Sequence, residues 1–355
     1  MPSNNRNLAL NNPLQTMYKE FGTEFWNDSC HIPDLMEAIK TGASGATSNP
    51  NIVSTVYTND KPRWDPVLQT LLVEHPDASE DELAWLLIER MATDAARLLH
   101  PVFEQTEGKR GFLSVQTNPR LYRSSAAMVA HGRQLSRLAP NMAIKVPATE
   151  AGITAMEQLS SEGILINATV CFTVAQCVAA ADAIERGLKK TNRPMSPYIT
   201  IMVGRLDDQL RRSAPKDISP TDLQLADWAG IAVFKKAYQI FRDKKYKSKL
   251  LVAAYRHPQH WSELIGENIV QTIPVTWWTQ FKNSGHVLKR TIDKPVDQEI
   301  LHSLEKNFPD FKKSYDKNGL APTEFLKFEP SVYTLTQFLT GYQDLTESIR
   351  KLILR

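Results

Sequence analysis

Short apolar segments alternate with helical patterns along most of this chain, and this alternation limits the fold more than any other feature. Eight segments have the length and the near-continuous apolar character of buried strands. They occupy residues 23–30, 45–49, 111–116, 142–147, 164–172, 198–205, 249–256 and 268–274. Strands that are apolar on both faces belong to parallel sheets covered by helices on both sides. Eight such units favour an α/β fold of the closed (β/α)8 type, the TIM barrel, over an open doubly wound sheet.

An open sheet that binds a dinucleotide is the main alternative architecture. It requires a Gly-x-Gly-x-x-Gly turn between a strand and the following helix. None of the eight segments is followed by that turn. The intervening patterns are helical, and the longest opens with a capping box formed by Ser79 and Glu82. Residues 51–79, with several Pro and Asp, predict an irregular segment.

The predicted barrel accounts for residues 23–285 and leaves additional chain on either side. Residues 1–22 predict an N-terminal arm with one short amphipathic stretch, and their polar start lacks the pattern of a signal peptide. Residues 286–355 predict a C-terminal helical extension, with helices near 297–308 and 335–354. We expect this extension to pack on the barrel within the same domain.

Composition excludes several classes of protein. The formal net charge of +3 and the pI near 8.6 are too mildly basic for a nucleic-acid-binding protein, although they suit an anionic small substrate. No apolar run reaches transmembrane length. We therefore expect a cytoplasmic, soluble protein without a nucleic-acid or membrane partner, and a homodimer is left open.

The chain has three cysteines, and this small, odd number argues against a disulfide framework. Cys30, Cys171 and Cys177 all lie in apolar patterns, which predicts buried thiols. No Cys/His pair has the spacing of a zinc site, so we expect no metal. His257 and His260 lie close to Arg256 in a polar stretch that predicts a solvated loop, and the alternative is that one of them assists Arg256 in binding a phosphate.

Polar residues occur near the carboxyl ends of seven of the eight predicted strands. In a (β/α)8 barrel these ends meet at one face, where the active site lies. A core containing so many polar residues would be unfavourable, because each buried polar group must find a hydrogen-bond partner. The set consists of Asp28, Asn49, Gln116, Lys145, Thr169 with Asn167, Thr200, Arg205 and Arg256.

Lys145 is the most unusual member, because it interrupts the apolar run 142–149. Burying an ammonium group without a partner is unfavourable, and desolvation lowers the pKa of a lysine. A neutral amine can attack a carbonyl and form a Schiff base. The alternative is a lysine at a strand end that extends its ammonium group into water.

The other strand-end residues have roles that follow from their chemistry. Asp28 would act as a general acid and base near the Schiff base, and Asn49 would bond a substrate hydroxyl. Two guanidinium groups at one rim, Arg205 and Arg256, suit a phosphate. The alternatives are an ion pair between Arg205 and the following aspartates, and a solvated loop position for Arg256.

Taken together, these motifs resemble the transaldolase family. The match runs in register over residues 23–282. Its segments are Asn27-Asp28-Ser29, Gly45-Ala46-Thr47-Ser48-Asn49-Pro50, Ile144-Lys145-Val146-Pro147-Ala148-Thr149, Asn167-Ala168-Thr169 with Phe172 and Ala175-Gln176, and Val203-Gly204-Arg205. The fructose-6-phosphate aldolases are a related group.

The resemblance implies a (β/α)8 barrel that transfers a three-carbon dihydroxyacetone unit between phosphorylated sugars, as in the pentose phosphate pathway, without a metal or organic cofactor. It implies that Lys145 forms the Schiff base, that Asp28 moves protons at the C4 hydroxyl, and that Thr169 positions the catalytic water. The substrate-binding residues that it implies, with neighbouring candidates, are Asn49, Thr47, Asn167, Thr200, Met202, Arg205 and Arg256.

Three positions depart from the family patterns. Gln116 stands where the usual transaldolases have a glutamate, and a glutamine cannot take a proton at neutral pH. The aldolases carry this glutamine but pair it with a tyrosine where this chain has Met202. Ala254 replaces a phosphate-binding serine. A class I aldolase that handles a free three-carbon ketone, and a non-catalytic sugar-phosphate-binding barrel, therefore remain alternatives to a transaldolase.

Overall fold

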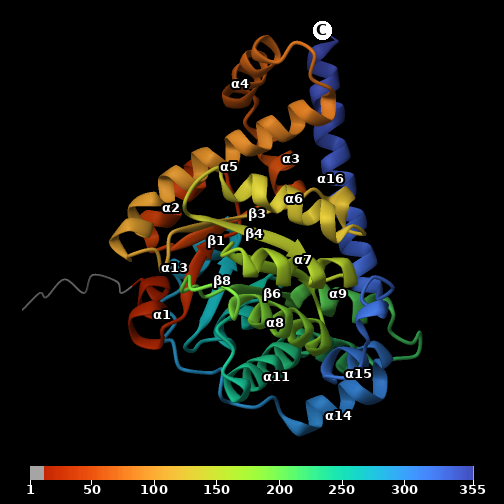
Figure 1. The fold of residues 1–355 in the computed structure, drawn as a ribbon. Coiled ribbons are helices and arrows are strands. Elements are labelled where there is room, and N and C mark those ends of the chain that lie inside the picture. Colours follow the sequence, from red (N-terminus) through yellow and green to blue (C-terminus); the bar gives the residue numbers. More distant parts are fainter. Residues whose placement is uncertain (1–11, 355) are drawn as a thin grey trace, which may run out of the picture.

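A computed structural model describes residues 12–354, in which eight parallel strands close into a barrel wrapped by helices (Figure 1). Each strand pairs with the next along the chain, and the eighth pairs with the first. The strands are β1 (Glu24–Asn27), β2 (Gly45–Thr47), β3 (Phe112–Gln116), β4 (Met142–Pro147), β5 (Ile166–Cys171), β6 (Tyr198–Met202), β7 (Lys249–Ala253) and β8 (Ile269–Ile273). This topology confirms the predicted TIM barrel.

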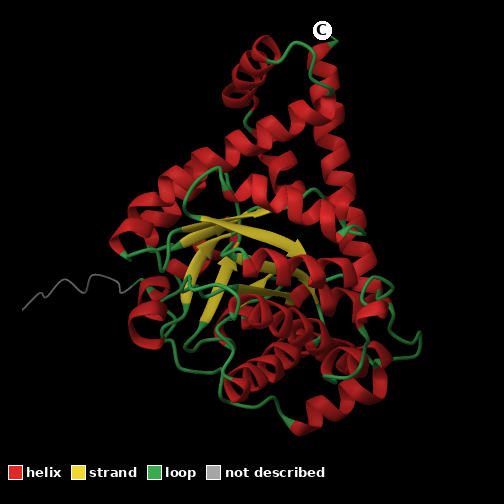
Figure 2. Ribbon diagram, viewed as in Figure 1, coloured by secondary structure: helices red, strands yellow, loops and turns green. Residues whose placement is uncertain are grey.

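Helices cover the outside of the barrel, so that the sheet is enclosed on all sides (Figure 2). Most of them connect consecutive strands, as the alternating pattern predicts. They are α1 (Pro13–Phe21), α2 (Ile32–Thr41), α3 (Pro50–Asn59), α4 (Lys61–Glu74), α5 (Glu80–Gln105), α6 (Ser125–Ser136), α7 (Glu150–Ser161), α8 (Val174–Leu188), α9 (Val203–Arg212), α10 (Pro220–Gln224), α11 (Ala229–Lys244), α12 (Gln259–Ser262), α13 (Val275–Lys282), α14 (Gln298–Asn307), α15 (Pro309–Tyr315) and α16 (Glu329–Ile353).

Apolar side chains fill the part of the barrel interior that lies towards the amino ends of the strands. The rings of Trp26 and Tyr198 meet edge to face across the barrel, with centroids 4.7 Å apart. Gly45 makes room for this packing, because a Cβ at that position would lie 2.4 Å from the Trp26 ring. Towards the amino ends of the strands the interior is thus closed, and there the buried Glu24 carboxylate is paired with Lys249 at 2.6 Å.

The prediction of an irregular segment at residues 51–79 is wrong, because α3 and α4 occupy most of it. Asn49 caps α3 by accepting a hydrogen bond from the backbone N–H of Ile52, at 3.0 Å, and Pro50 occupies the first helical turn. Proline is compatible with that turn, where the backbone N–H groups have no partner within the helix. Within residues 51–79, Pro62 likewise begins α4, and Pro66 lies inside that helix.

Seven of the eight strands are shorter than predicted, and two of these differences change the surroundings of site residues. β6 ends at Met202 and passes directly into α9, so Arg205 lies on a helix and not on a strand. β7 ends at Ala253, and Ala254 adopts a left-handed conformation with φ of 65°. Between β6 and β7, the chain forms α9, α10, a short 3-10 turn at Leu225–Trp228 and α11.

The C-terminal residues form α14, α15 and the long helix α16, which begins six residues before the predicted start at 335. The first part of α16 reaches the carboxyl face of the barrel. There, Leu335 and Phe338 join Phe328 in an apolar cluster with Phe172 and Met202, at the ends of β5 and β6. The helix then continues along α3 and α5 towards the projecting end of the molecule (Figure 1).

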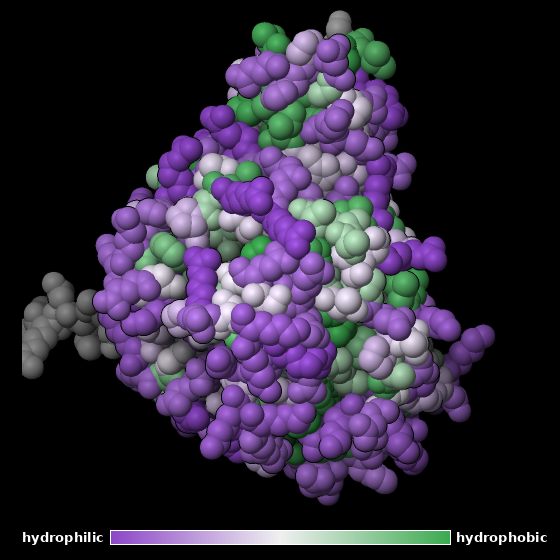
Figure 3. Space-filling view, in the orientation of Figure 1, coloured by the Kyte–Doolittle hydropathy of each residue, from purple (hydrophilic) through white to green (hydrophobic). Residues whose placement is uncertain are grey.

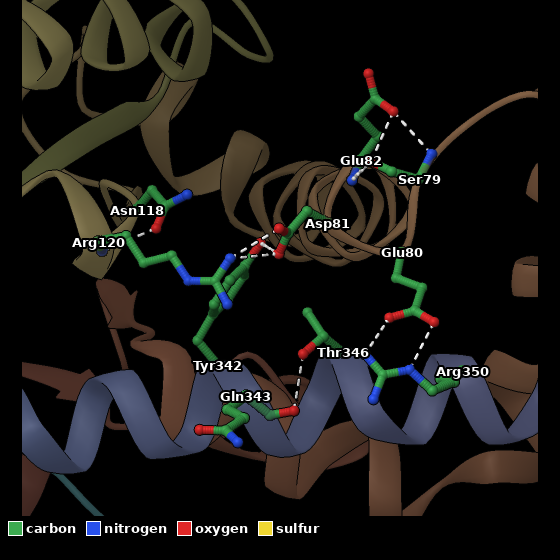
Figure 4. A network of polar contacts seen from close by, with 10 residues as sticks. All are labelled: Ser79, Glu80, Asp81, Glu82, Asn118, Arg120, Tyr342, Gln343, Thr346 and Arg350. Atoms are coloured by element: carbon green, nitrogen blue, oxygen red, sulfur yellow. Dashed lines mark hydrogen bonds and ion pairs between the residues drawn. The ribbon is translucent and has the colours of Figure 1, made fainter.

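Polar contacts hold the second half of α16 against α5 (Figure 4). The hydroxyl of Tyr342, which is almost fully buried, donates a hydrogen bond to Asp81 at 2.8 Å. Arg120 pairs with the same carboxylate, at 2.7 Å, and its guanidinium lies 4.9 Å from the Tyr342 ring. Further along, Arg350 forms a two-pronged ion pair with Glu80, where both partners are exposed.

The surface seen in Figure 3 is largely hydrophilic, with hydrophobic atoms gathered at the projecting end, where α4 and the C-terminus of α16 lie. Val73 and Leu354, at the ends of these helices, are 82% and 78% exposed. Single exposed apolar residues are common on folded proteins. Within residues 12–354, no helix combines the length and the apolar character that crossing a membrane requires. The cysteines Cys30, Cys171 and Cys177 are buried and free, as predicted.

The contrast between Tyr342 and Arg350 gives a test of what holds α16 in place. Tyr342→Ala should lower the free energy of unfolding by about 3 kcal/mol or more, because it opens a cavity and removes a partner of Asp81. Tyr342→Phe should lower it by about 1 kcal/mol. Arg350→Ala should change it little, because exposed ion pairs stabilise weakly. Urea denaturation measures all three. An Arg350→Ala effect equal to that of Tyr342→Ala would contradict this account.

Candidate active site

Lys145 lies inside the carboxyl end of the barrel with only 4% of its surface exposed. Its Nζ donates to the backbone oxygen of Ser48, which follows β2, at 3.3 Å. Burial, with a smaller contribution from the Arg205 guanidinium, lowers the pKa of Lys145 to about 8, although the Asp28 carboxylate opposes the shift. The alternative of an ammonium group extended into water is therefore wrong.

Asp28 follows β1 and is the acidic partner of Lys145. Its Oδ1 accepts a hydrogen bond from Thr47 Oγ1 at 2.6 Å. Burial raises the pKa of this carboxyl, while Lys145, Thr47 and Arg205 each oppose the rise. An acid and an amine whose pKa values are both moved towards neutrality can exchange protons with a substrate in this pH range.

Thr47 also lies 2.7 Å from the hydroxyl of Thr272, so that the two hydroxyl groups share a hydrogen bond. Thr272 is on β8, the one strand from which the sequence predicted no site residue. The run 268–274 also contains Asn268 and Gln271, so Thr272 was not distinguished from them by the sequence. All eight strands, or the residues that follow them, thus contribute polar groups to this face.

A second set of hydrogen bonds orients the residues of β5 and β6. The amide nitrogen of Asn167 donates to Ser114 Oγ at 2.9 Å, and its carbonyl oxygen accepts from Thr200 Oγ1 at 2.6 Å. Ser114, on β3, is another residue that the sequence prediction missed, although it interrupts an apolar run. Since Asn167 is satisfied on both sides, it positions Thr200, whose oxygen can still accept a hydrogen bond.

Gln116 and Thr169 lie on β3 and β5, the two strands that pair with the lysine strand β4. Gln116 pairs with Lys145 in the register of β3 and β4, and Thr169 pairs with Pro147 in the register of β4 and β5. Gln116 Oε1 and Thr169 Oγ1 are buried but have no hydrogen-bond partner within the part of the chain that the structure describes. Such groups normally bond to a ligand or an ordered water. They therefore suit the placement of a substrate hydroxyl or a reacting water next to the amine.

Arg205, on α9, contacts the C-terminal helix instead of a carboxylate. One of its terminal nitrogens donates to Thr334 Oγ1 at 3.2 Å and to the side-chain oxygen of Gln337. The guanidinium also lies 5.9 Å from the ring of Phe338. The alternative of an ion pair with the following aspartates is wrong for this residue. The partners Thr334 and Gln337 lie 129 and 132 residues further along the chain, and no sequence pattern indicated them.

Arg256 follows β7 and is the residue that does form an ion pair. Its Nε donates to Asp208 Oδ2 at 2.8 Å, and its NH1 group donates to the backbone oxygen of Tyr255 at 3.0 Å. The side chain is 39% exposed, but it is not a free loop residue as the alternative had it. Burial and the neighbouring Arg256 guanidinium together lower the pKa of Arg205 to about 10. The positive charge of Arg256 thus acts on Arg205, while the Asp208 carboxylate opposes this effect.

Asn49 and Met202 are the remaining candidates for substrate binding. Asn49 uses its side-chain oxygen to cap α3, which leaves its amide nitrogen as the group that can donate to a substrate. Met202 is 5% exposed and packs among apolar side chains of α16. Their roles in substrate binding stay predictions.

The predicted solvated loop at residues 257–260 is wrong for His260. This imidazole is fully buried behind Arg256, and its Nε2 lies 2.8 Å from Asp207 Oδ2. Its Nδ1 accepts a hydrogen bond from the backbone N–H of Arg256 at 3.1 Å. The sequence suggested a loop because polar residues surround this histidine, whereas packing between α9 and α12 removes it from solvent.

Comparison with known proteins gives the same family as the motifs. A family model described as transaldolase/fructose-6-phosphate aldolase matches residues 25–331. A transaldolase from Thiobacillus denitrificans is 32% identical over 208 residues, which cover 56% of this chain and 57% of that relative. Longer matches are found with transaldolase 2 of Streptomyces avermitilis and with a transaldolase of Neisseria gonorrhoeae. The first is 26% identical over 84% of this chain and 88% of the relative, and the second is 28% identical over 79% and 86%.

The family match extends from β1 into α16 and therefore covers the whole barrel, including Lys145 and both rim arginines. The resemblance seen in the sequence is confirmed by a match over most of the chain. The chain belongs to the transaldolase/fructose-6-phosphate aldolase family and is an enzyme of transaldolase-like function.

Proposed function

We propose that this enzyme transfers a dihydroxyacetone unit from a ketose phosphate to an aldose phosphate through a Schiff base on Lys145. The observation that carries the proposal is the burial of the Lys145 amine beside the Asp28 carboxylate, with its pKa lowered to about 8. A substantial fraction of such an amine is neutral near physiological pH, so it can act as a nucleophile.

The reaction begins when Nζ of Lys145 attacks the C2 carbonyl of the ketose. The adduct loses water and becomes a positively charged imine. Asp28 then removes the proton of the C4 hydroxyl, the C3–C4 bond breaks, and an aldose phosphate leaves. The electron pair of that bond stays on the three-carbon unit as an enamine. It adds to the carbonyl of a second aldose, the proton returns through Asp28, and water releases the new ketose from the lysine.

Gln116 and Thr169 suit the handling of water in this sequence. Their unpartnered oxygen atoms are buried on either side of the lysine strand. The Thr169 hydroxyl can both donate and accept, so it can hold a water beside the imine carbon. Gln116 can orient the same water but cannot take its proton. Protons in this reaction are therefore moved by Asp28 and by hydroxyl groups, including those of the substrate.

Arg205 and Arg256 are proposed to bind the substrate's phosphate at the rim. The Coulomb interaction between them supports a shared anion, because a phosphate would relieve their repulsion. Arg256 would exchange part of its contact with Asp208 for the phosphate. The Gln337 and Thr334 contacts hold Arg205 in place from α16.

A class I aldolase that releases or captures a free three-carbon ketone is the second candidate. It is favoured by one observation, the presence of Gln116, because the related fructose-6-phosphate aldolases carry glutamine where the usual transaldolases have a glutamate. The two reactions share every step up to the enamine. They differ in whether the enamine waits for an aldehyde or is protonated first. A non-catalytic sugar-phosphate-binding barrel is disfavoured by the buried pair of Lys145 and Asp28.

We also propose a cytoplasmic location, phosphorylated sugars as the substrates, and no nucleic-acid partner. The mild net charge of +3 supports the last point. A homodimer stays a prediction, which light scattering of the purified protein can test.

Borohydride reduction in the presence of fructose 6-phosphate should attach a three-carbon or six-carbon adduct to Lys145. Peptide mass spectrometry locates the adduct. Lys145→Ala should abolish it, while the exposed Lys109 serves as a matched control, because Lys109→Ala should leave it unchanged. An adduct on a different lysine, or none at all, would show that the proposed mechanism is wrong.

Release of free dihydroxyacetone distinguishes the transferase from the aldolase. With fructose 6-phosphate alone, a transferase should release little ketone, and erythrose 4-phosphate should accelerate turnover strongly. Gln116→Glu supplies the residue of the usual transaldolases and should therefore lower the release of free ketone relative to transfer. If ketone leaves the unchanged enzyme equally fast with and without the aldose, the transferase proposal is refuted.

The charges around Lys145 predict that two substitutions shift the pH dependence of its acylation in opposite directions. Acylation of Lys145 by a small reagent requires the neutral amine, so its rate should rise with pH up to about 8. Asp28 raises the pKa of Lys145, and Asp28→Asn should therefore move this rise to lower pH. Arg205 lowers that pKa, and Arg205→Gln should move the rise to higher pH.

Mass spectrometry of the Lys145 peptide at a series of pH values measures the effect. Arg205→Lys keeps the positive charge and is the control, which should leave the profile near that of the unchanged enzyme. Shifts in the same direction for Asp28→Asn and Arg205→Gln would refute this electrostatic account.

A further inference from the structure

The main chain that carries Arg256 approaches α9 unusually closely. Ala254 has a left-handed backbone, with φ of 65°. A Cβ on Gly204 of α9 would lie 2.2 Å from the Ala254 carbonyl oxygen, 2.5 Å from Arg256 Cγ and 3.2 Å from a ring carbon of His260. Only a glycine at position 204 permits this approach. Residues 254–256, α9 and His260 thus form one tightly packed unit beside the proposed phosphate site.

The hydrogen bonds of His260 determine which of its nitrogens carries the proton. The backbone N–H of Arg256 can only donate, so Nδ1 of His260 must accept and is unprotonated. Nε2 then carries the hydrogen and donates it to Asp207 Oδ2 at 2.8 Å. The imidazole is neutral, fully buried and satisfied on both sides.

Asp207 is equally well satisfied. Its Oδ1 accepts from the backbone N–H of Gly230 at 2.8 Å, and its Oδ2 accepts from His260. Burial opposes ionisation of this carboxyl, but the bonds from His260 and Gly230, together with the nearby His257, hold its pKa below the ordinary value. The carboxylate therefore fixes His260 in the orientation that Arg256 requires.

A metal ion is the competing interpretation of this cluster, because donor atoms of Asp207, His257 and His260 lie within 4.8 Å of one another. A metal on Nε2 of His260 would leave that imidazole without any proton, since Nδ1 already accepts from the main chain. Metal-binding histidines instead donate their second N–H to an acceptor. The arrangement fits hydrogen bonding better than metal binding.

We propose that Asp207 and His260 are positioning residues for phosphate recognition, which act by fixing the main chain of Arg256 so that its guanidinium faces the rim. This inference rests on the proposed phosphate role of Arg256. The neighbouring Asp208 holds the guanidinium itself, through Nε at 2.8 Å. Consecutive aspartates of α9 thus control the backbone and the side chain of one arginine, and the same helix carries Arg205.

The role differs from that of a residue that only stabilises the fold. A positioning role predicts a loss of affinity specific to substrates that carry phosphate.

Four variants separate the contacts. His260→Gln keeps a donor near Asp207 but loses the acceptor for the Arg256 N–H, whereas His260→Asn keeps that acceptor. Gly230 and His260 donate to different oxygens of Asp207, and Asp207→Asn replaces one of these oxygens by an NH2 group that cannot accept. Arg256→Ala removes the guanidinium.

The measurements are KM and kcat for fructose 6-phosphate and for unphosphorylated fructose, with the inhibition constant of inorganic phosphate. His260→Gln and Asp207→Asn should raise KM for fructose 6-phosphate about tenfold, the effect of one lost hydrogen bond, with little change in kcat. The phosphate inhibition constant should rise in parallel. KM for fructose should stay unchanged, and His260→Asn should recover most of the affinity. Thermal unfolding establishes that each variant is folded.

The outcomes distinguish this inference from the proposed function. If Arg256→Ala does not raise KM for fructose 6-phosphate above that for fructose, the phosphate role itself is wrong. If Arg256→Ala has that effect but folded His260→Gln and Asp207→Asn do not, the positioning role is overturned. Equal increases for both sugars would also overturn it. Nitrogen-15 NMR of labelled histidine in the unaltered enzyme gives an independent test, because a proton on Nδ1 of His260 would contradict the inferred hydrogen bonds.

Discussion

Burial of a lysine amine at the carboxyl end of a closed barrel is the constraint around which the site is arranged. Desolvation disfavours the ammonium form of Lys145, and the Asp28 carboxylate opposes this effect without cancelling it. Asp28 is in turn held by Thr47, which shares a hydrogen bond with Thr272. The closed barrel makes this possible, because it surrounds one side chain with strands on all sides and still leaves one end open.

The C-terminal extension contributes directly to the site. α16 supplies the hydrogen-bond partners of Arg205 and covers the ends of β5 and β6 with apolar side chains. Gln176, behind β5, also donates to Ser331 at 3.2 Å, at the start of this helix. The second half of α16 is fixed to α5 through Tyr342. The contact of Tyr342 with α5 and the position of Arg205 therefore both depend on α16.

α9 links the two rim arginines, because it carries Arg205 and the Asp208 carboxylate that pairs with Arg256. It begins where β6 ends, and within six residues it carries Gly204, Arg205, Asp207 and Asp208. Both rim arginines are therefore positioned by α9. Arg205 influences the pKa values of both Lys145 and Asp28, so a phosphate bound there would also change the charge that the amine experiences.

The sequence by itself determined the barrel and its reacting groups. Eight apolar strands, and a lysine and an aspartate at two of their ends, are local patterns, and closure of a parallel barrel brings such ends together. Only the tertiary structure decided that α16 reaches Arg205, that Thr272 completes the polar face, and that His260 is buried behind Arg256. Those features depend on contacts between distant segments and on exclusion of water, which neighbouring residues in the chain do not encode. The helices in residues 51–79 were missed for a local reason, since prolines that begin a helix resemble those of a loop.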